Sequence, residues 1–338
     1  MEKVKNNYDS VDLFKFIASI MVFIMHAMAF DDFAMLSAGW SMLSRWCVPF
    51  FFLASSYFFF SGGNKNVYPQ KMLKYIKRIA ILYLSWFIIN IPGIYKIRIL
   101  DSSSSHKWLN LLKNSLFSSS FTGSWYLLSS IFSCILVVLL SKKLSNKGIV
   151  LITLIIEIIC IFSSVWSNAH FVAPFQKYLS MFYFPHNIFG GCFYFALGKV
   201  LAENKDKIKK YSFKIYFILF LCSALLYAAE VIISKICGCL GSNDKSFMCI
   251  FFGLFAFLSS LTMPIHLPQK AALTMRKSST VIYCAQCNLI VLAEFIVKNV
   301  SFPFSHFISF AIVSLIMTVL VFVVLLLQKR IKFAKYLT

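Results

Sequence analysis

Four polar residues near the start of the chain share one face of a predicted apolar helix. Lys15 and His26 are eleven positions apart, which in an α-helix amounts to three turns plus about 20°. Asp12 and Ser19, three positions before and four positions after Lys15, fall on the same stripe. The lysine and the histidine are then about 16 Å apart along the helix axis. Such a lysine can bind an anion, and such an imidazole can accept a hydroxyl proton near neutral pH.

Each of these residues also has an ordinary structural interpretation. Lys15 can be an interfacial lysine whose ammonium group reaches the lipid headgroups, and His26 can be a histidine bonded to a neighbouring helix. Ionisable residues inside a membrane span are costly, however, and by default they mark a functional pathway. Two of them on one polar stripe therefore favour a site or a pathway.

Other residues at predicted membrane depth are candidates for the same site. Glu157 and Glu294 lie deep in apolar segments, where they are expected to pair with Lys15 or to shape a cavity. Trp125 and Tyr126 begin another apolar segment, either as an interface anchor or as a stacking platform for a sugar or an acyl group. Most cysteines lie inside apolar segments, and no pair has a partner at zinc spacing, so the sequence predicts no metal site.

The elements that must position these residues are membrane helices. Of 338 residues, 59% are hydrophobic and 13% are charged, whereas a soluble domain has about a quarter charged residues. We therefore expect one membrane-embedded, all-α domain over residues 1–338, without a soluble domain. A span needs about 20 mostly apolar residues. The ten predicted spans are 11–30, 40–61, 78–99, 124–141, 148–166, 184–203, 211–233, 247–263, 279–298 and 303–328, and the aromatic stretch 168–183 is a candidate re-entrant segment.

The net charge of +21 is distributed in short clusters between the spans. These clusters recur in alternate connections, beginning with Lys3 and Lys5 and including the run from Lys205 to Lys214. Because basic loops stay in the cytoplasm, both termini are predicted to be cytoplasmic. Clusters of this kind contact anionic lipid headgroups, so membrane lipid is the expected partner and nucleic acid is not.

Five segments in order along the chain resemble the acyltransferase 3 family of membrane proteins. The first combines a basic residue, ten intervening positions and a histidine, as in Lys15 and His26. This chain has Lys15 and His186 where the family often has arginine, and Gln286 where it often has histidine. The matching segments are 8–15 with His26, 48–57, 125–127, 185–198 and 281–283.

The resemblance implies a multi-pass O-acyltransferase of the plasma membrane. Its expected reaction moves acetyl from acetyl-CoA to a hydroxyl of a capsule, exopolysaccharide or other envelope glycan, free or lipid-linked. Acetyl-CoA would be a co-substrate, and no permanently bound cofactor is expected. The sequence does not indicate an oligomeric state.

The resemblance also implies roles for the candidate residues. His26 would act as general base on the acceptor hydroxyl, or would carry the acyl group transiently. Lys15 would bind the anionic coenzyme, with Asp12 and Ser19 beside it. The residues expected around the acceptor and the cavity are Trp125, Tyr126, His186, Asn187, Gln286 and Glu157.

Two other functions are compatible with intramembrane polar residues. A transporter or flippase of a glycan pathway also uses histidine and glutamate relays, but it would favour inverted repeats with broken helices, which the sequence does not display clearly. A non-catalytic membrane subunit would explain the departures from the family pattern. Acyl transfer that depends on His26 distinguishes the enzyme from both.

Overall fold

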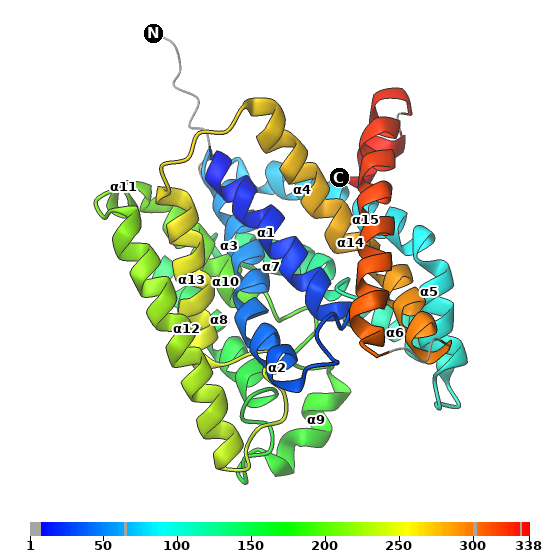
Figure 1. Ribbon diagram of the computed structural model, residues 1–338. Coiled ribbons are helices and arrows are strands. Elements are labelled where there is room, and N and C mark those ends of the chain that lie inside the picture. The colour runs from blue at the N-terminus through cyan, green and yellow to red at the C-terminus, as the bar shows by residue number, and fades with distance from the viewer. Residues whose placement is uncertain (1–7, 64–65, 300–302, 332) are drawn as a thin grey trace.

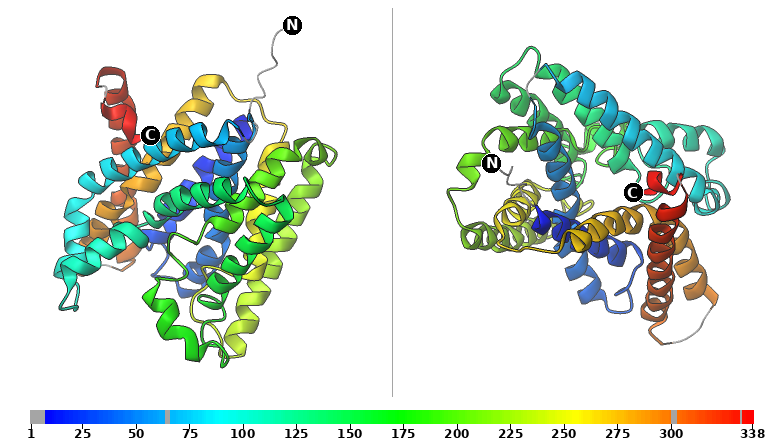
Figure 2. Two further views of the ribbon diagram at one scale, coloured as in Figure 1. Left: turned by 180° about the vertical axis from the view of Figure 1, so that it is seen from behind. Right: turned by 90° about the horizontal axis from the view of Figure 1, so that it is seen from above.

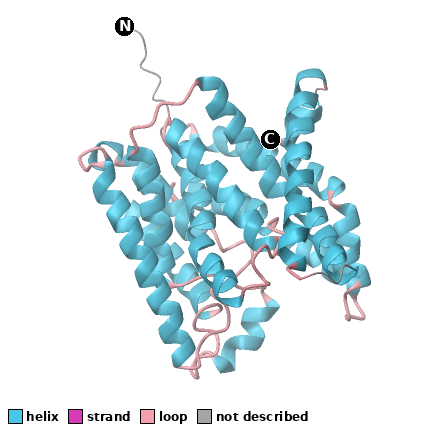
Figure 3. Ribbon diagram, in the orientation of Figure 1, coloured by secondary structure: helices cyan, strands magenta, loops and turns pink. Residues whose placement is uncertain are grey.

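The computed structural model describes residues 8–63, 66–299, 303–331 and 333–338. Over these residues the chain forms helices joined by turns and loops, without a strand (Figure 3). The all-α prediction is confirmed. Lys3 and Lys5, which contributed to the predicted orientation, lie outside the described residues.

The polar stripe lies on a central helix that packs mainly against two others. Helix α1 (Asp9–His26) lies in the middle of the bundle, against α3 (Cys47–Phe60) and the long α14 (Gln269–Asn299) (Figure 1 and Figure 2). Helices α7 (Trp125–Leu140) and α10 (Cys192–Glu203) pack on α3. The other helices are α2 (Ala34–Leu43), α4 (Tyr68–Ile89), α5 (Ile91–Tyr95), α6 (Lys107–Phe117), α8 (Asn146–Phe162), α9 (Gln176–Met181), α11 (Lys205–Ile208), α12 (Phe213–Ile236), α13 (Phe247–Thr262) and α15 (Ser305–Arg330).

Glycines allow the helices around α3 to approach closely. A Cβ added to Gly198 of α10 would lie 2.6 Å from the Cβ of Ser56, and one added to Gly253 of α13 would overlap Pro49. Interior side chains are packed at crystal-like density, so larger residues at these positions would push the helices apart. Helix α3 is thereby held between α10 and α13.

Every predicted span overlaps a helix, but the helices differ in how well they suit a membrane. Among the described residues, four helical segments are long and apolar enough to cross one, or five if α4 and the segment 91–100 count as one span bent by 70°. The length and apolar composition of these helices thus indicate a membrane protein, while the ten crossings and the cytoplasmic termini remain predictions. Helices α12 and α15 turn apolar side chains outward along their length, where lipid would cover them.

Several predicted boundaries are wrong for one physical reason. The span predicted at 78–99 begins ten residues earlier, at Tyr68 of α4, and is bent after Ile89, and the span predicted at 279–298 begins at Gln269. Lysines and arginines interrupt the apolar run in the first turns of α4 and of α14, so the hydropathy criterion places these turns in loops. The helices continue through them instead. The connection between the predicted spans 78–99 and 124–141 contains α6, and the candidate re-entrant stretch 168–183 forms α9 and turns.

Candidate active site

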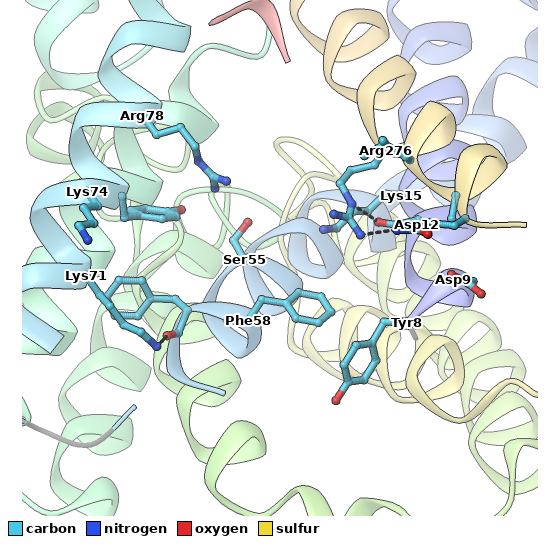
Figure 4. A pocket seen from close by; sticks show the side chains of 15 residues that line it. Tyr8, Asp9, Asp12, Lys15, Ser55, Phe58, Lys71, Lys74, Arg78 and Arg276 are labelled. Carbon is cyan, nitrogen blue, oxygen red and sulfur yellow. Dashed lines mark hydrogen bonds and ion pairs between the residues drawn. The ribbon is translucent and has the colours of Figure 1, made fainter. Parts of the chain in front are cut away.

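A cavity of about 860 Å³ opens between α1, α3, α4 and the beginning of α14 (Figure 4). We call it the basic cavity, because most of its charged lining residues are cations. Its two acidic residues are Asp9, which accepts a hydrogen bond from the Leu267 backbone N–H, and Asp12. The cations are Lys15, Lys71, Lys74, Arg78 and Arg276.

Helix α4 supplies three of these cations from a single face. Lys71, Lys74 and Arg78 follow one another at spacings of three and four, which places them on one side of a helix. Lys71 also donates to the Phe59 carbonyl at 3.2 Å. Arg276 lies on the opposite wall, so the cavity is bounded by positive charge on both sides (Figure 4).

The wall formed by α1 and α14 is organised by an ion pair. Arg276 donates from Nε and Nη2 to the two carboxylate oxygens of Asp12, at 2.9 and 2.6 Å. The side chain of Asp12 is 4% exposed, whereas that of Arg276 is 58% exposed and remains accessible to a ligand. Lys15 lies beside this pair, with its ammonium 5.2 Å from the centre of the Phe58 ring. Asp12 therefore positions a cation instead of facing a phosphate itself.

A second space of about 400 Å³ adjoins the basic cavity, and we call it the lobe. The two share lining residues from α1, α3, α4 and α14, among them Lys15 and Ser55. Away from the cations the lobe is lined by Phe51, Tyr126 and Tyr283. The combined space has a basic mouth and an aromatic interior, which suits a ligand with an anionic head and an uncharged arm.

A third space, the distal pocket, measures only about 50 Å³. Trp125 and His186 line it with their ring centres 5.1 Å apart. Arg45 donates to the Asp244 carboxylate, and His186 Nε2 lies 3.7 Å from Oδ2 of that carboxylate. Burial would raise the pKa of Asp244, but Arg45 and His186 outweigh it and hold this pKa below its ordinary value.

His26 is the last residue of α1 and lies next to the distal pocket. It is half-buried and interacts electrostatically with Arg45, Asp244 and His186, all of which line that pocket. Lys15, on the same helix, lines the basic cavity and the lobe. Helix α1 thus connects the two spaces, with its cation at one and its imidazole at the other, about 16 Å apart along the axis.

A buried ion pair closes the side of the distal pocket. Lys245 Nζ lies 2.8 and 2.9 Å from the carboxylate oxygens of Glu157 and donates to the Gly190 carbonyl at 2.7 Å. Burial would lower the pKa of Lys245, but Glu157 outweighs it and raises this pKa above its ordinary value. Glu157 therefore pairs with Lys245 and not with Lys15, and it acts on the cavity only through Lys245.

Some predicted site residues make local contacts away from the three spaces. Ser19, Asn187 and Gln286 each donate a side-chain hydrogen bond to a backbone carbonyl three to five positions earlier, at 2.7–2.8 Å. None of them lines the basic cavity, the lobe or the distal pocket, and neither does the half-buried Glu294. Tyr126 does line the lobe, where its hydroxyl is bonded to Ser55.

The sequence interpretation missed most of the cations at the site. Hydropathy places Lys71 and Lys74 in the connection before the predicted span 78–99, Arg78 at the first position of that span, and Arg276 in the connection before the span 279–298. Their spacing carried a usable signal, since 71, 74 and 78 repeat as one face of a helix. Lys245 carried no such signal, because a contact between residues 157 and 245 is not encoded in local periodicity.

Comparisons with known proteins identify the family of the chain. The model of a family described as an acyltransferase domain, acyltransferase 3, matches residues 8–327. Two relatives named amino-acid racemases, both from Enterococcus faecalis, are 28% identical over 188 residues and 24% identical over 219 residues. These matches cover 54% and 60% of this chain but 26% and 29% of the relatives, so the chain spans less than a third of their length. No solved structure matches the chain.

Proposed function

The chain belongs to the acyltransferase 3 family, and from this premise we propose that it transfers acetyl from acetyl-CoA to a hydroxyl of a cell-surface carbohydrate. Family membership and the apolar helices make it a membrane acyltransferase. The donor, the acceptor, the plasma membrane as its location and the roles of individual residues belong to the proposal.

The charge of the basic cavity is the observation that carries the proposal. Five cations line it, on two facing walls, and one of its two carboxylates is already paired with Arg276. Coenzyme A carries three phosphate groups at one end, and arginine and lysine bind phosphate oxygens through charge-assisted hydrogen bonds. A donor of this kind matches both the sign and the extent of the charge.

The lobe gives the uncharged part of the donor a place to lie. The pantetheine arm of coenzyme A has amides and methylene groups but no charge. An arm that begins at Lys15 and Arg78 would run past Ser55 toward Tyr126, all of which line the lobe. The thioester would then face the middle of α1, with His26 farther along the same helix.

His26 is the group we assign to the acceptor hydroxyl. In the proposed step the acceptor oxygen bonds to the acyl carbon while the carbon–sulfur bond of the thioester breaks. The hydroxyl proton passes to His26 and then to the thiolate of coenzyme A, so the products are an ester and a free thiol. Asp244 would stabilise the transient imidazolium by its opposite charge. If His26 carries the acyl group first, the overall balance is the same.

Trp125 and His186 are the residues we assign to the acceptor. Their tilted ring pair flanks the distal pocket. With about 50 Å³, this pocket would receive only the hydroxyl group that is acylated, and the sugar ring would lie outside it, against the Trp125–His186 pair. A soluble glycan or a lipid-linked one would present the same hydroxyl chemistry here.

The experiment follows radiolabelled acetyl from acetyl-CoA into envelope polysaccharide in membranes that contain the chain. Replacing the proposed base, His26→Ala, is expected to lower the transfer rate about 10²–10⁴-fold. The control is His170→Ala, since His170 is exposed and lines none of the three spaces. Transfer that persists in His26→Ala at the level of His170→Ala would remove His26 from the mechanism. Wild-type membranes that move no label would refute the donor and acceptor assignment.

A further inference from the structure

The basic cavity and the distal pocket lie at different depths along the same two helices. On α1, Lys15 lines the basic cavity, whereas Val22 and Met25 line the distal pocket. Helix α3 runs the other way, so Ser55 lines the basic cavity and Val48 the distal pocket. Among the described residues, the distal pocket shares no lining residue with the basic cavity or the lobe. The two ends of α1 therefore face separate spaces.

A layer of four rings separates these spaces, and we call it the aromatic partition: Phe51, Phe52, Tyr126 and Tyr283. Phe51 lines the lobe and its neighbour Phe52 the distal pocket, just as Tyr126 lines the lobe and its neighbour Trp125 the distal pocket. The ring centres are 4.6 Å apart for Phe52 and Tyr126, and 5.6 Å apart for Tyr126 and Tyr283. Rings at these separations are in contact.

Hydrogen bonds hold the face of the partition that lines the lobe. The Tyr126 hydroxyl is 2.9 Å from Ser55 Oγ and 3.3 Å from the Phe51 carbonyl oxygen. Tyr283 donates to the carbonyl of Gly123 at 3.1 Å. Replacing either tyrosine would therefore remove polar contacts as well as a ring.

Phe52 differs from these tyrosines because packing alone holds it. Its ring lies directly on the backbone of Gly191, where an added Cβ would overlap the ring, and its side chain is completely buried. It also contacts Tyr194 on α10, with the two rings stacked at 6.4 Å. Phe52, like Phe51, can thus be made smaller without breaking a side-chain hydrogen bond, and of the two it is Phe52 that lines the distal pocket.

The size of the distal pocket limits what can react beside His26. At about 50 Å³, the distal pocket has about an eighth of the volume of the lobe, which measures about 400 Å³. An acetyl group brings three non-hydrogen atoms into this small space, whereas a butyryl group brings two further methylenes. Phe52 occupies the boundary that a longer chain would have to cross.

We propose that the aromatic partition selects short acyl groups, and that Phe52 is the residue that sets the length limit. The inference rests on the proposed function, since it assumes an acyl donor in the lobe and transfer beside His26. Removal of the Phe52 ring joins the distal pocket to the lobe and makes room for additional methylenes. In a confined apolar site, each methylene changes the relative rate about 10-fold or more.

The experiment compares labelled acetyl-CoA with labelled butyryl-CoA as donors to envelope polysaccharide, in membranes containing wild type, Phe52→Ala or Phe50→Ala. Phe50 is the matched control, because it is a completely buried phenylalanine on the same helix that lines none of the three spaces. We expect the ratio of butyryl to acetyl transfer to rise at least about 10-fold in Phe52→Ala and to stay at the wild-type value in Phe50→Ala.

The outcomes separate the inference from the proposed function. If wild type transfers acetyl but the ratio is equal in Phe52→Ala and Phe50→Ala, the partition does not select acyl length. If wild type transfers neither group, the proposed function fails and the inference fails with it. Should Phe52→Ala not accumulate in the membrane, the milder Phe52→Leu is expected to raise the ratio in the same direction, and an unchanged ratio there would also refute the inference.

Discussion

At the scale of single residues, the geometry of Arg276 distinguishes it from the lysines of the basic cavity. Its guanidinium makes two parallel hydrogen bonds to Asp12 and stays more than half exposed. A lysine in its place keeps the charge but cannot form this bidentate pair. The burial of Asp12 thus fixes the direction in which one cation faces the cavity.

This geometry predicts the kinetic effect of Arg276→Lys. The KM for acetyl-CoA is expected to rise about 10-fold with little change in kcat, because the interaction binds the donor and the transition state alike. Steady-state rates of acyl transfer over a range of acetyl-CoA concentrations provide the measurement. Arg330→Lys, at an exposed position at the end of α15, is the control. Equal KM values in the two variants would show that Arg276 does not bind the donor.

At the scale of elements, the loop after α1 is hydrogen-bonded to the first turn of α15. The Asp32 carboxylate accepts hydrogen bonds from the backbone N–H groups of His306 and Phe307, and lies 2.9 Å from His306 Nδ1. Partial burial would raise the pKa of Asp32, but these contacts outweigh it and leave the pKa below its ordinary value. A carboxylate at the N-terminus of a helix also interacts favourably with the helix dipole.

Asp32 is therefore predicted to stabilise the protein in a pH-dependent manner. Because its folded-state pKa is lowered, the stabilisation is present above the ordinary pKa of about 3.9 and is lost as the pH falls through the folded-state value. Asp32→Asn is expected to cost about 1 kcal/mol at pH 7. Thermal unfolding of purified protein in detergent, followed from pH 7 to pH 3, should show the difference from wild type shrinking below pH 4.

The neighbouring carboxylate offers a control for this effect. Asp31 is exposed and accepts a hydrogen bond from Ser37 within the same loop region. Asp31→Asn is expected to leave the unfolding temperature nearly unchanged over the same pH range. A difference between Asp32→Asn and wild type that persists undiminished at pH 3 would contradict the assigned role of the carboxylate.

At the scale of the whole molecule, the sequence predicts where helices form better than it predicts which helices pack against one another. Apolar runs locate a helix in each of the ten predicted segments, and the spacing of Lys15 and His26 places both on one helix. Periodicity gives the polar face of a helix but not the element that packs on it. The contacts of Arg276 with Asp12 and of Lys245 with Glu157 join residues more than 80 positions apart, so they emerge only from the packed bundle.

Basic residues at helix ends were the main source of error in the predicted site. Hydropathy treats a lysine as the end of a span, yet α4 and α14 continue through their cations and carry them over the cavity. Hydrogen bonding within the helix satisfies the backbone, and the long side chains reach water in the cavity. The charges that predict the orientation of the chain therefore also line the site, and hydropathy alone does not distinguish these two roles.

The predicted orientation can be tested with native cysteines. Cys237 is exposed just after α12, in a connection that ten crossings with a cytoplasmic N-terminus would place outside the cell. A membrane-impermeant maleimide is expected to label Cys237 in intact cells, and Cys237→Ser should lower the labelling. A cysteine introduced as Lys207→Cys should react only after permeabilisation. If Cys237 reacts only after permeabilisation and Lys207→Cys reacts in intact cells, the orientation is the opposite of the predicted one.

The length of α14 has a consequence for the energetics of the reaction. Its 31 residues extend about 46 Å, well beyond the roughly 30 Å of hydrocarbon, even at a typical tilt of about 20°. Because the predicted apolar span begins at residue 279, the first turns, which include Arg276, would extend beyond the hydrocarbon. On the proposed function, the strongly hydrated phosphate groups of coenzyme A can stay at the water boundary throughout turnover. Only the small neutral acyl group then has to be dehydrated.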